Sequence, residues 1–399
     1  MSQHISVGID IGTYQIKVVI AENVRLEDGT YSPRVIGTGF AESKGLRHGY
    51  IINVDDVTRC IRFAVGQAEK ISKTKIKQAY ISVGGIGLSA ITGKGSTMIS
   101  KADSEITDLD IKNVMTIAES EIPQSLLMNK TIIYTVPLGY KIDDQVVMGR
   151  PKGMHGNRLE AKVLFIVCLE QHLNDLIRAT EAAGIDVIDV MASPIAASFV
   201  SLTKTQKIAG CVLVNIGSET VSVVVYENNI PISLEIFPVG STDITNDIAL
   251  GFRVPIDEAE NIKTRSTNAE TKYPKKKLDE IIARRLSDIF ALIEAHLKKI
   301  GRSGLLPAGI ILTGGGSGIE SLEDAARTSL KLPSKIATIN LISNLKNTEL
   351  KDSFWSVAYG LSIWGLNNDE GDSSTGLHIS MSKTKIFKNT KDWFKQFLP

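Results

Sequence analysis

The stretch that decides the fold is Val7-Gly8-Ile9-Asp10-Ile11-Gly12-Thr13-Tyr14-Gln15-Ile16-Lys17-Val18, and a second copy of its pattern stands at Leu213-Val214-Asn215-Ile216-Gly217-Ser218-Glu219-Thr220-Val221-Ser222-Val223. In each copy apolar residues alternate, the chain turns at a glycine, and the alternation resumes, which predicts a β-hairpin. A small polar residue followed by a bare glycine lets backbone N–H groups close around phosphate oxygens. Two such hairpins facing each other predict a nucleotide site between two related lobes.

The composition is that of a soluble globular protein with two domains or more. The chain has 399 residues, a hydrophobic fraction of 43% and a net charge of +1. The near-zero charge argues against a general nucleic-acid binder. The cysteines, Cys60, Cys168 and Cys211, are scattered without a CxxC pair, which favours a reducing cytoplasm. The histidines lack metal-ligand spacing, and we expect neither a signal peptide nor a membrane-spanning run.

The order of apolar and polar stretches predicts an α/β protein with an inserted module. In the first part we expect strands at 5–11, 15–21, 34–41 and 79–83 and a helix at 54–72. Residues 86–165 form a separate module, with a helix from Asp108 to Glu121 that Pro123 stops and a clear strand at 132–138. Further elements are a strand at 161–169, a helix at 170–183, a strand at 187–191, helices at 241–249 and within 256–300, a strand within 308–316 and an apolar helix at 353–366.

Three local patterns carry chemistry. Asp10 cannot touch phosphate without repulsion, so it would act through Mg²⁺ or a water on Mg²⁺; the alternative is an aspartate that only stabilises its turn. The run Thr313-Gly314-Gly315-Gly316 follows an apolar strand and lets the backbone approach a base or phosphate closely. Glu258 and Lys263 share one helix, which on local evidence alone is an exposed, salt-bridged helix.

The ordered set of these motifs resembles the actin / Hsp70 / sugar-kinase superfamily, and within it the FtsA family of bacterial cell-division proteins. The stretches Ser43 to Gly49, Asn53 to Asp55, Glu258 to Lys263 and Ala308 to Gly315 carry the closer resemblance. It implies an actin-like ATPase fold with two ribonuclease-H-like lobes around a nucleotide cleft. It also implies this domain plan: 1–85 and 166–203 as subdomain 1A, 86–165 as an FtsA-type 1C (SHS2) insertion, 204–252 and 304–366 as subdomain 2A, and 253–303 as subdomain 2B.

The resemblance also implies the ligands and their residues. The cofactors would be ATP and Mg²⁺. Asp10 would face the metal, Gly12, Thr13 and Gln15 would meet the phosphates, Asn215, Gly217, Ser218 and Glu219 would form the second hairpin, Glu258 and Lys263 would flank the adenosine, and Gly314, Gly315 and Gly316 would lie under it.

One departure from the family pattern concerns the second hairpin. The family usually has Asp-Ile-Gly-Gly-Gly-Thr, whereas this chain has Asn215-Ile216-Gly217-Ser218-Glu219-Thr220. An amide replaces a metal-facing carboxylate, and Glu219 adds negative charge near the phosphates unless it points outward. ATP binding is therefore expected with slow or absent hydrolysis, and the sequence names no catalytic base.

The end of the chain predicts attachment to a membrane surface. A polar, Gly/Ser-rich linker at 367–382 precedes an amphipathic helix at 383–399. Its apolar residues are Ile386, Phe387, Trp393, Phe394, Phe397 and Leu398, and its basic residues include Lys388, Lys391 and Lys395. A basic face opposite an aromatic face is typical of an interfacial membrane helix. The alternative is a helix that docks on its own domain.

Three functions are compatible with these patterns. The leading hypothesis is a membrane-tethering actin homologue at the cytoplasmic face of the cell membrane. There it would bind ATP, self-assemble into protofilaments and anchor the tubulin-like protein FtsZ at the division site. The second is a PilM-like actin homologue of type IV pilus assembly, which the terminal helix disfavours. The third is a sugar kinase or phosphatase, which would need an aspartate base between the lobes, and the sequence shows no such signature.

Overall fold

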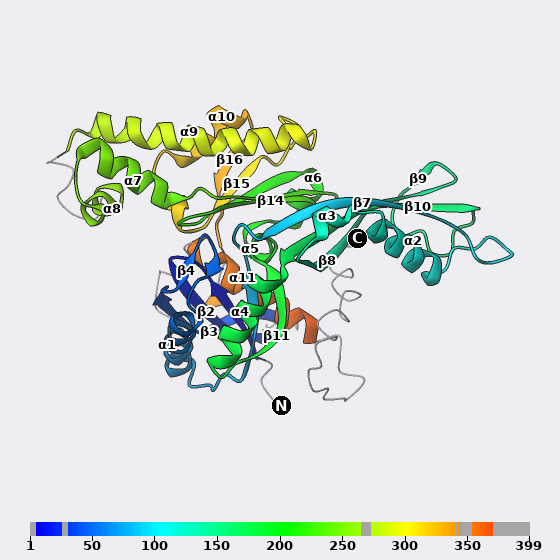
Figure 1. Ribbon diagram of the computed structural model, residues 1–399, viewed down its shortest axis with the longest axis horizontal. Coiled ribbons are helices and arrows are strands. Elements are labelled where there is room, and N and C mark those ends of the chain that lie inside the picture. Colours follow the sequence, from blue (N-terminus) through cyan, green and yellow to red (C-terminus); the bar gives the residue numbers. More distant parts are fainter. Residues whose placement is uncertain (1–4, 26–30, 265–272, 340–341, 344–352, 370–399) are drawn as a thin grey trace.

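The computed structural model describes residues 5–25, 31–264, 273–339, 342–343 and 353–369. Two lobes lie one above the other, and a third part projects sideways from them (Figure 1). The first lobe, with β2, β3 and α1, is at the bottom of Figure 1, and the second lobe, with the long helix α9, lies across its top. The elongated part with β7, β10 and α2 extends to the right.

The first lobe is a mixed six-stranded sheet covered by helices on both faces. Its strand order is β11-β6-β1-β2-β3-β17. Helices α1 and α4 contact each other along the sheet, and α11 packs on β1 and β2 together with α5. The strands are β1 (Ile5–Ile11), β2 (Gln15–Arg25), β3 (Tyr31–Glu42), β6 (Gln78–Val83), β11 (Asp186–Ala192) and β17 (Ile342–Ser343), and the helices are α1 (Val54–Ser72), α4 (Glu170–Ala182), α5 (Ser193–Ser201) and α11 (Ser356–Asp369).

The second lobe repeats this plan around a five-stranded sheet. Its order is β14-β13-β12-β15-β16, with β12 between its antiparallel hairpin partner and the parallel β15. The strands are β12 (Cys211–Ile216), β13 (Val221–Glu227), β14 (Ile230–Phe237), β15 (Ile310–Thr313) and β16 (Ser334–Ile336). The helices are α6 (Lys204–Ala209), α7 (Ser241–Phe252), α8 (Ile256–Thr264), α9 (Lys275–Lys299) and α10 (Leu322–Leu330), with the short 3-10 turn η2 (Gly315–Gly318). A further 3-10 turn, η4 (Ser353–Trp355), leads into α11, and its Trp355 packs with Val19 and Val35 of the first lobe.

The third part is a separate four-stranded sheet inserted into the first lobe, with the order β7-β10-β8-β9. Its first and last strands lie side by side, since Leu88 pairs with Cys168, so the insertion leaves and rejoins the lobe at one place. Its strands are β7 (Leu88–Met98), β8 (Lys130–Ile142), β9 (Gln145–Val147) and β10 (Arg158–Leu169), and its helices are α2 (Asp108–Ser120) and α3 (Gln124–Leu127). A small hairpin of β4 (Leu46–Arg47) and β5 (Tyr50–Ile51) belongs to the first lobe instead.

One hydrophobic core joins all three parts. It contains Ile9 and Ile81 of the first sheet, Ile166 of the inserted sheet, and Leu234 and Ile236 of β14 in the second lobe. Accordingly β14 packs against β7 and β8. Burial of apolar side chains contributes ~25 cal/mol per Å², so this shared core fixes the insertion against the second lobe.

The elements expected from apolar periodicity are present, and several bounds agree residue for residue. Helix α1 covers Val54–Ser72 as predicted. It begins where the Asn53 side chain accepts hydrogen bonds from the N–H groups of Asp55 and Asp56, and it buries the expected stripe that includes Ile61 and Ala68. Strand β1 also has its expected bounds, whereas β8 and β10 are longer than predicted. The domain boundaries stay a prediction.

Both predicted hairpins form in the same register. In the first, Asp10 pairs with Lys17 and Ile11 with Ile16; in the second, the aligned residues Asn215 and Ser222 form the pair that corresponds to Asp10 and Lys17.

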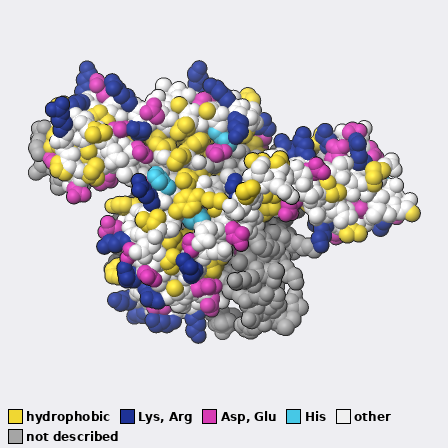
Figure 2. All heavy atoms as spheres, viewed as in Figure 1, with side chains coloured by type: hydrophobic (Ala, Val, Ile, Leu, Met, Phe, Trp, Pro, Cys, Tyr) yellow, Lys and Arg dark blue, Asp and Glu magenta, His cyan; other side chains and the backbone are white. Residues whose placement is uncertain are grey.

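On the face shown in Figure 2, basic and acidic side chains occur together on all three parts. No helix in the described ranges is sufficiently long and apolar to cross a membrane.

Candidate functional site

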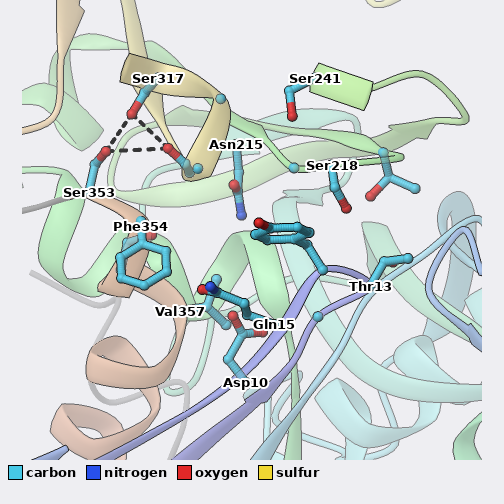
Figure 3. A pocket seen from close by; sticks show the side chains of 18 of the residues that line it. Asp10, Thr13, Gln15, Asn215, Ser218, Ser241, Ser317, Ser353, Phe354 and Val357 are labelled. Atoms are coloured by element: carbon cyan, nitrogen blue, oxygen red, sulfur yellow. Dashed lines mark hydrogen bonds between the residues drawn. The ribbon is translucent and has the colours of Figure 1, made fainter. Parts of the chain in front are cut away.

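A cavity of about 980 Å³ lies between the lobes, with the two hairpins on facing sides. Figure 3 shows Asp10 and Gln15 on one side of it and Asn215 with Ser218 on the other. The volume suits a nucleotide-sized ligand. Of the residues that the sequence analysis assigned to ligand binding, the cavity brings together Asp10, Gly12, Thr13, Gln15, Asn215, Gly217, Ser218, Lys263, Gly314, Gly315 and Gly316.

The hairpin turns have matching geometry. The N–H of Gly12 donates to the carbonyl of Gln15 at 3.2 Å, and the N–H of Gly217 donates to the carbonyl of Thr220 at 2.9 Å. A Cβ added to either glycine would lie 2.9 Å from that carbonyl oxygen. Each turn therefore requires a residue without a side chain, as the repeated pattern predicts.

Asp10 is held by two partners. Its Oδ1 accepts a hydrogen bond from the Ser82 hydroxyl at 2.9 Å, and its Oδ2 lies 3.3 Å from the Lys17 ammonium. Lys17 stands directly across the hairpin from Asp10, and its side chain is 13% exposed. The Lys17 ammonium also lies over the Phe354 ring, 4.6 Å from the ring centroid. The sequence analysis missed Lys17 because it looked like an ordinary polar residue of a strand.

The glycine run at the end of β15 lies against the second hairpin. Gly314 has φ +92°, and a Cβ there would lie 2.1 Å from the Asn215 Oδ1 atom. A Cβ on Gly316 would lie 2.5 Å from the Ile216 side chain. Gly315 has open space where its Cβ would project. The dashed lines in Figure 3 show how Ser317 and Ser353 tie this turn to the start of the last helix.

The helix α8 brings Glu260, rather than Glu258, to the cavity. The Lys263 ammonium lies 2.7 Å from the Glu260 carboxylate and donates to the Thr245 hydroxyl at 2.8 Å. Glu258 is absent from the cavity lining, and it accepts a hydrogen bond from the Tyr273 hydroxyl at 2.5 Å. The i,i+3 spacing of Glu260 and Lys263 was the signal in the sequence for this contact.

Glu219 also lies outside the cavity lining, and it connects the lobes instead. Its Oε2 accepts a hydrogen bond from the backbone N–H of His48 at 2.5 Å, and its carbonyl oxygen is 3.3 Å from the His48 Nδ1 atom. The neighbouring Gly49 N–H donates to the Thr13 hydroxyl at 3.0 Å, and the His48 carbonyl accepts from Ile86 at the root of the insertion. The segment around His48 therefore contacts both hairpin tips and the insertion.

Two buried polar atoms in the cavity lining suit a hydrogen-bonding ligand. Gln15 Oε1 and Trp355 Nε1 have no hydrogen-bond partner within the described parts of the chain. Buried polar groups of this kind are expensive to leave unpaired. Phe354 and Trp355 line the same side of the cavity and were not identified from the sequence.

The described residues offer a poor donor set for a Mg²⁺ ion that has no nucleotide phosphates among its ligands. Among them, no group of three or more His, Cys, Asp or Glu side chains could hold a metal ion. The acidic residues that line the cavity are Asp10 and Glu260, and each has a lysine partner. Mg²⁺ prefers oxygen ligands, usually carboxylates together with phosphates. The arrangement thus fits a polyphosphate better than it fits a free divalent metal.

The residues expected to meet a membrane lie outside the described residues. These are Ile386, Phe387, Lys388, Lys391, Trp393, Phe394, Lys395, Phe397 and Leu398.

Two family models match the chain. The model for the cell division protein FtsA matches residues 212–360, and the model for the SHS2 domain inserted in FtsA matches residues 87–167. The second range coincides with the inserted sheet, and the first spans most of the second lobe.

Similarity to curated proteins extends along nearly the whole chain. The chain is 26% identical to the cell division protein FtsA of Pseudomonas aeruginosa, with 97% of this chain and 96% of that protein covered. It is 28% identical to FtsA of Bacillus subtilis, over 84% of this chain and 79% of that protein. It is 26% identical to FtsA of Escherichia coli, over 98% and 97% respectively.

Solved structures share the fold. The PilM-PilN type IV pilus biogenesis complex matches with a TM-score of 0.66 at 17% identity, over 90% of this chain and 98% of that chain. MreB5 of Spiroplasma citri bound to ADP matches with a TM-score of 0.51 at 12% identity, over 93% and 99%. The fold is the actin-like α/β fold with an SHS2 insertion, as the sequence predicts. It makes nucleotide binding plausible for the interlobe cavity.

Proposed function

Because the chain belongs to the FtsA family of cell division proteins, we propose that it binds ATP, assembles into filaments and tethers FtsZ to the inner face of the cell membrane at the division site. The observation that carries the proposal is similarity to FtsA proteins along nearly the full chain, including the inserted SHS2 domain.

ATP is the proposed ligand of the interlobe cavity. Backbone N–H groups near the turns at Gly12 and Gly217, which are the tips of the two hairpins, would meet the phosphates. Lys263 on α8 and the open backbone at Gly315 would meet the nucleoside. The sequence also predicted Mg²⁺ beside Asp10. In the structure the Lys17 ammonium forms an ion pair with that carboxylate, so a metal there would share Asp10 with Lys17.

The terminal segment is the proposed membrane anchor, on the evidence of its sequence. Its aromatic residues would enter the headgroup region, and its lysines would meet anionic lipids. A single short helix binds weakly and reversibly, so assembly into filaments would strengthen attachment by multivalency. Filaments on the membrane would then present FtsZ-binding surfaces along the division site.

The PilM-like hypothesis is the second candidate, and the observation in its favour is the fold likeness to the PilM-PilN complex. At 17% identity this likeness shows the fold alone. The family models and the FtsA relatives favour the first candidate.

Co-pelleting with vesicles tests the proposed function. The full chain and a truncation lacking residues 383–399 would be sedimented with anionic vesicles, with and without ATP. We expect the full chain to pellet, more strongly with ATP, and to carry FtsZ with it, while the truncation stays in solution. Equal pelleting of the two proteins would exclude the terminal anchor. Failure of the bound full chain to recruit FtsZ would favour the PilM-like candidate.

A further inference from the structure

The two hairpins present unlike charges to the cavity although their backbones match. In the first, a carboxylate and an ammonium stand opposite each other at Asp10 and Lys17. In the second, the corresponding positions hold the uncharged Asn215 and Ser222. The ligand's phosphates would therefore meet one lysine-neutralised carboxylate on one side and an amide on the other.

The position of Lys17 is fixed by its surroundings. The antiparallel register places it directly across from Asp10, where opposite charges stabilise the strand pair. The centroid of the Phe354 ring lies 4.6 Å from the ammonium, and such a cation–π contact gains strength when the ammonium is shielded from water. The Ser82 hydroxyl occupies the other oxygen of Asp10. A divalent metal at Asp10 would have to displace this ammonium or lie beside it against charge repulsion.

We propose that Lys17 takes the role of the divalent cation, so that the cavity binds ATP with nearly equal affinity in the presence and absence of Mg²⁺. The inference rests on the proposal that the cavity takes ATP. The lysine supplies the positive charge that offsets the repulsion between the Asp10 carboxylate and the phosphates. Because this charge is on a side chain held in place, it is present whether or not a metal ion is bound. The second hairpin places no carboxylate in the cavity lining, because Glu219 is turned to His48.

Measurement of the ATP dissociation constant by calorimetry, in Mg²⁺ and in EDTA, tests the proposal. The decisive quantity is the dissociation constant in EDTA divided by the dissociation constant in Mg²⁺. For the intact chain we expect this ratio to be below about threefold. Lys17→Met exposes the charge of Asp10 and should raise the ratio above about tenfold. Asp10→Asn combined with Lys17→Met removes both charges and should return the ratio to near unity. Lys94→Met, at an exposed position on the inserted sheet, is the matched control and should leave the ratio unchanged.

The outcomes separate this inference from the proposed function. Loss of more than about tenfold in affinity when EDTA replaces Mg²⁺ would overturn the role of Lys17 while leaving ATP binding intact. No ATP binding under either condition would overturn both. If Lys17→Met fails to fold, Asn215→Asp provides a second test, because a carboxylate restored on the second hairpin should make ATP binding depend on Mg²⁺. An unchanged ratio in a folded Asn215→Asp variant would also count against the proposal.

Discussion

The Glu219 carboxylate accepts a hydrogen bond from the backbone N–H of His48 across the cleft, and so it joins the tip of the second hairpin to the first lobe. A residue that seemed set to repel phosphate therefore points away from the cavity lining. The His48 ring adds a second contact, to the Glu219 carbonyl. The two lobes are thus connected at the end of the cleft where the hairpin tips lie.

Weakening this connection should speed the release of a bound nucleotide. Hydrogen bonds to charged groups contribute ~1.5–3 kcal/mol. Since the Glu219 side chain is 27% exposed, we expect the lower part of that range or less, about 1 kcal/mol, which corresponds to about fivefold faster release for Glu219→Ala. Stopped-flow displacement of a fluorescent ATP analogue measures the rate. Glu121→Gln, at an exposed position on the insertion, is the control, and an unchanged rate in Glu219→Ala would show that the connection does not restrain release.

Substitutions at neighbouring glycines should separate ligand binding from folding. Gly315→Val places a side chain in open space within the cavity lining, so the free protein should keep its melting temperature. The stabilisation by ATP, ~2.7 kcal/mol at a hundredfold excess over Kd, should shrink. Gly314→Val collides with Asn215 and has an unfavourable positive φ, so it should lower stability without ligand. Thermal melts with and without ATP distinguish the two, and an unaltered ATP shift in Gly315→Val would argue against the proposed site.

ATP turnover should be slow or undetectable. Asn215 stands where the first hairpin has a carboxylate, and within the described residues the acidic side chains of the cavity are paired with lysines. In the described part of the chain, the cavity therefore lacks an unpaired carboxylate to act as the general base for a water. Phosphate release over hours at saturating ATP measures the rate. Robust multiple turnover by the unmodified chain would contradict this prediction.

His296 should make the protein less stable in mild acid. Burial, with a smaller effect of Lys299, lowers its pKa from 6.5 to about 4, although Glu235 lies 3.6 Å from the ring. Between pH 6.5 and pH 4 the unfolded chain therefore takes up a proton that the folded protein does not, and stability falls as pH falls. We expect a loss of at most about 2 kcal/mol between pH 7 and pH 5. Denaturant melts of the parent and of His296→Gln measure it, and an equal loss in both would assign the effect elsewhere.

The terminal segment should lose its affinity for membranes when its aromatic residues become acidic. Each large apolar side chain contributes roughly 1.5–3 kcal/mol when fully buried, and the lysines add ~1 kcal/mol each near an anionic surface. Trp393→Glu combined with Phe394→Glu should release the protein from anionic vesicles and leave ATP binding unchanged. A double variant that pellets as well as the parent would remove the anchor from this segment.

The fold could be predicted from the sequence because its signals are local and repeated. The alternation around Gly12 and Gly217 defines both hairpins, and the Asn53 cap with its apolar stripe defines α1. The inserted sheet was recognisable as a module since it interrupts an otherwise continuous lobe.

The details of the site depended on contacts that local patterns do not reveal. Glu260 is the exception, because it stands three residues before Lys263 and shares its side of the helix, whereas Glu258 lies on another side, so helical periodicity could have identified it. The role of Lys17 depends on the ring of Phe354, which is more than three hundred residues away along the chain. The hydrogen bond between Glu219 and His48 likewise could not be predicted, because it forms only when the two lobes are packed together.

The shared core that runs from the first sheet through Ile166 to Leu234 has a mechanical consequence. The insertion has a core of its own, with Val114, Val163 and Phe165 between its sheet and α2, and the opposite face of its sheet, at Leu164 and Ile166, continues the interior of both lobes. A force applied to the tip of the insertion would reach the base of the second sheet through packed side chains, without first stretching a linker. The root of the inserted sheet is therefore packed rigidly against both lobes.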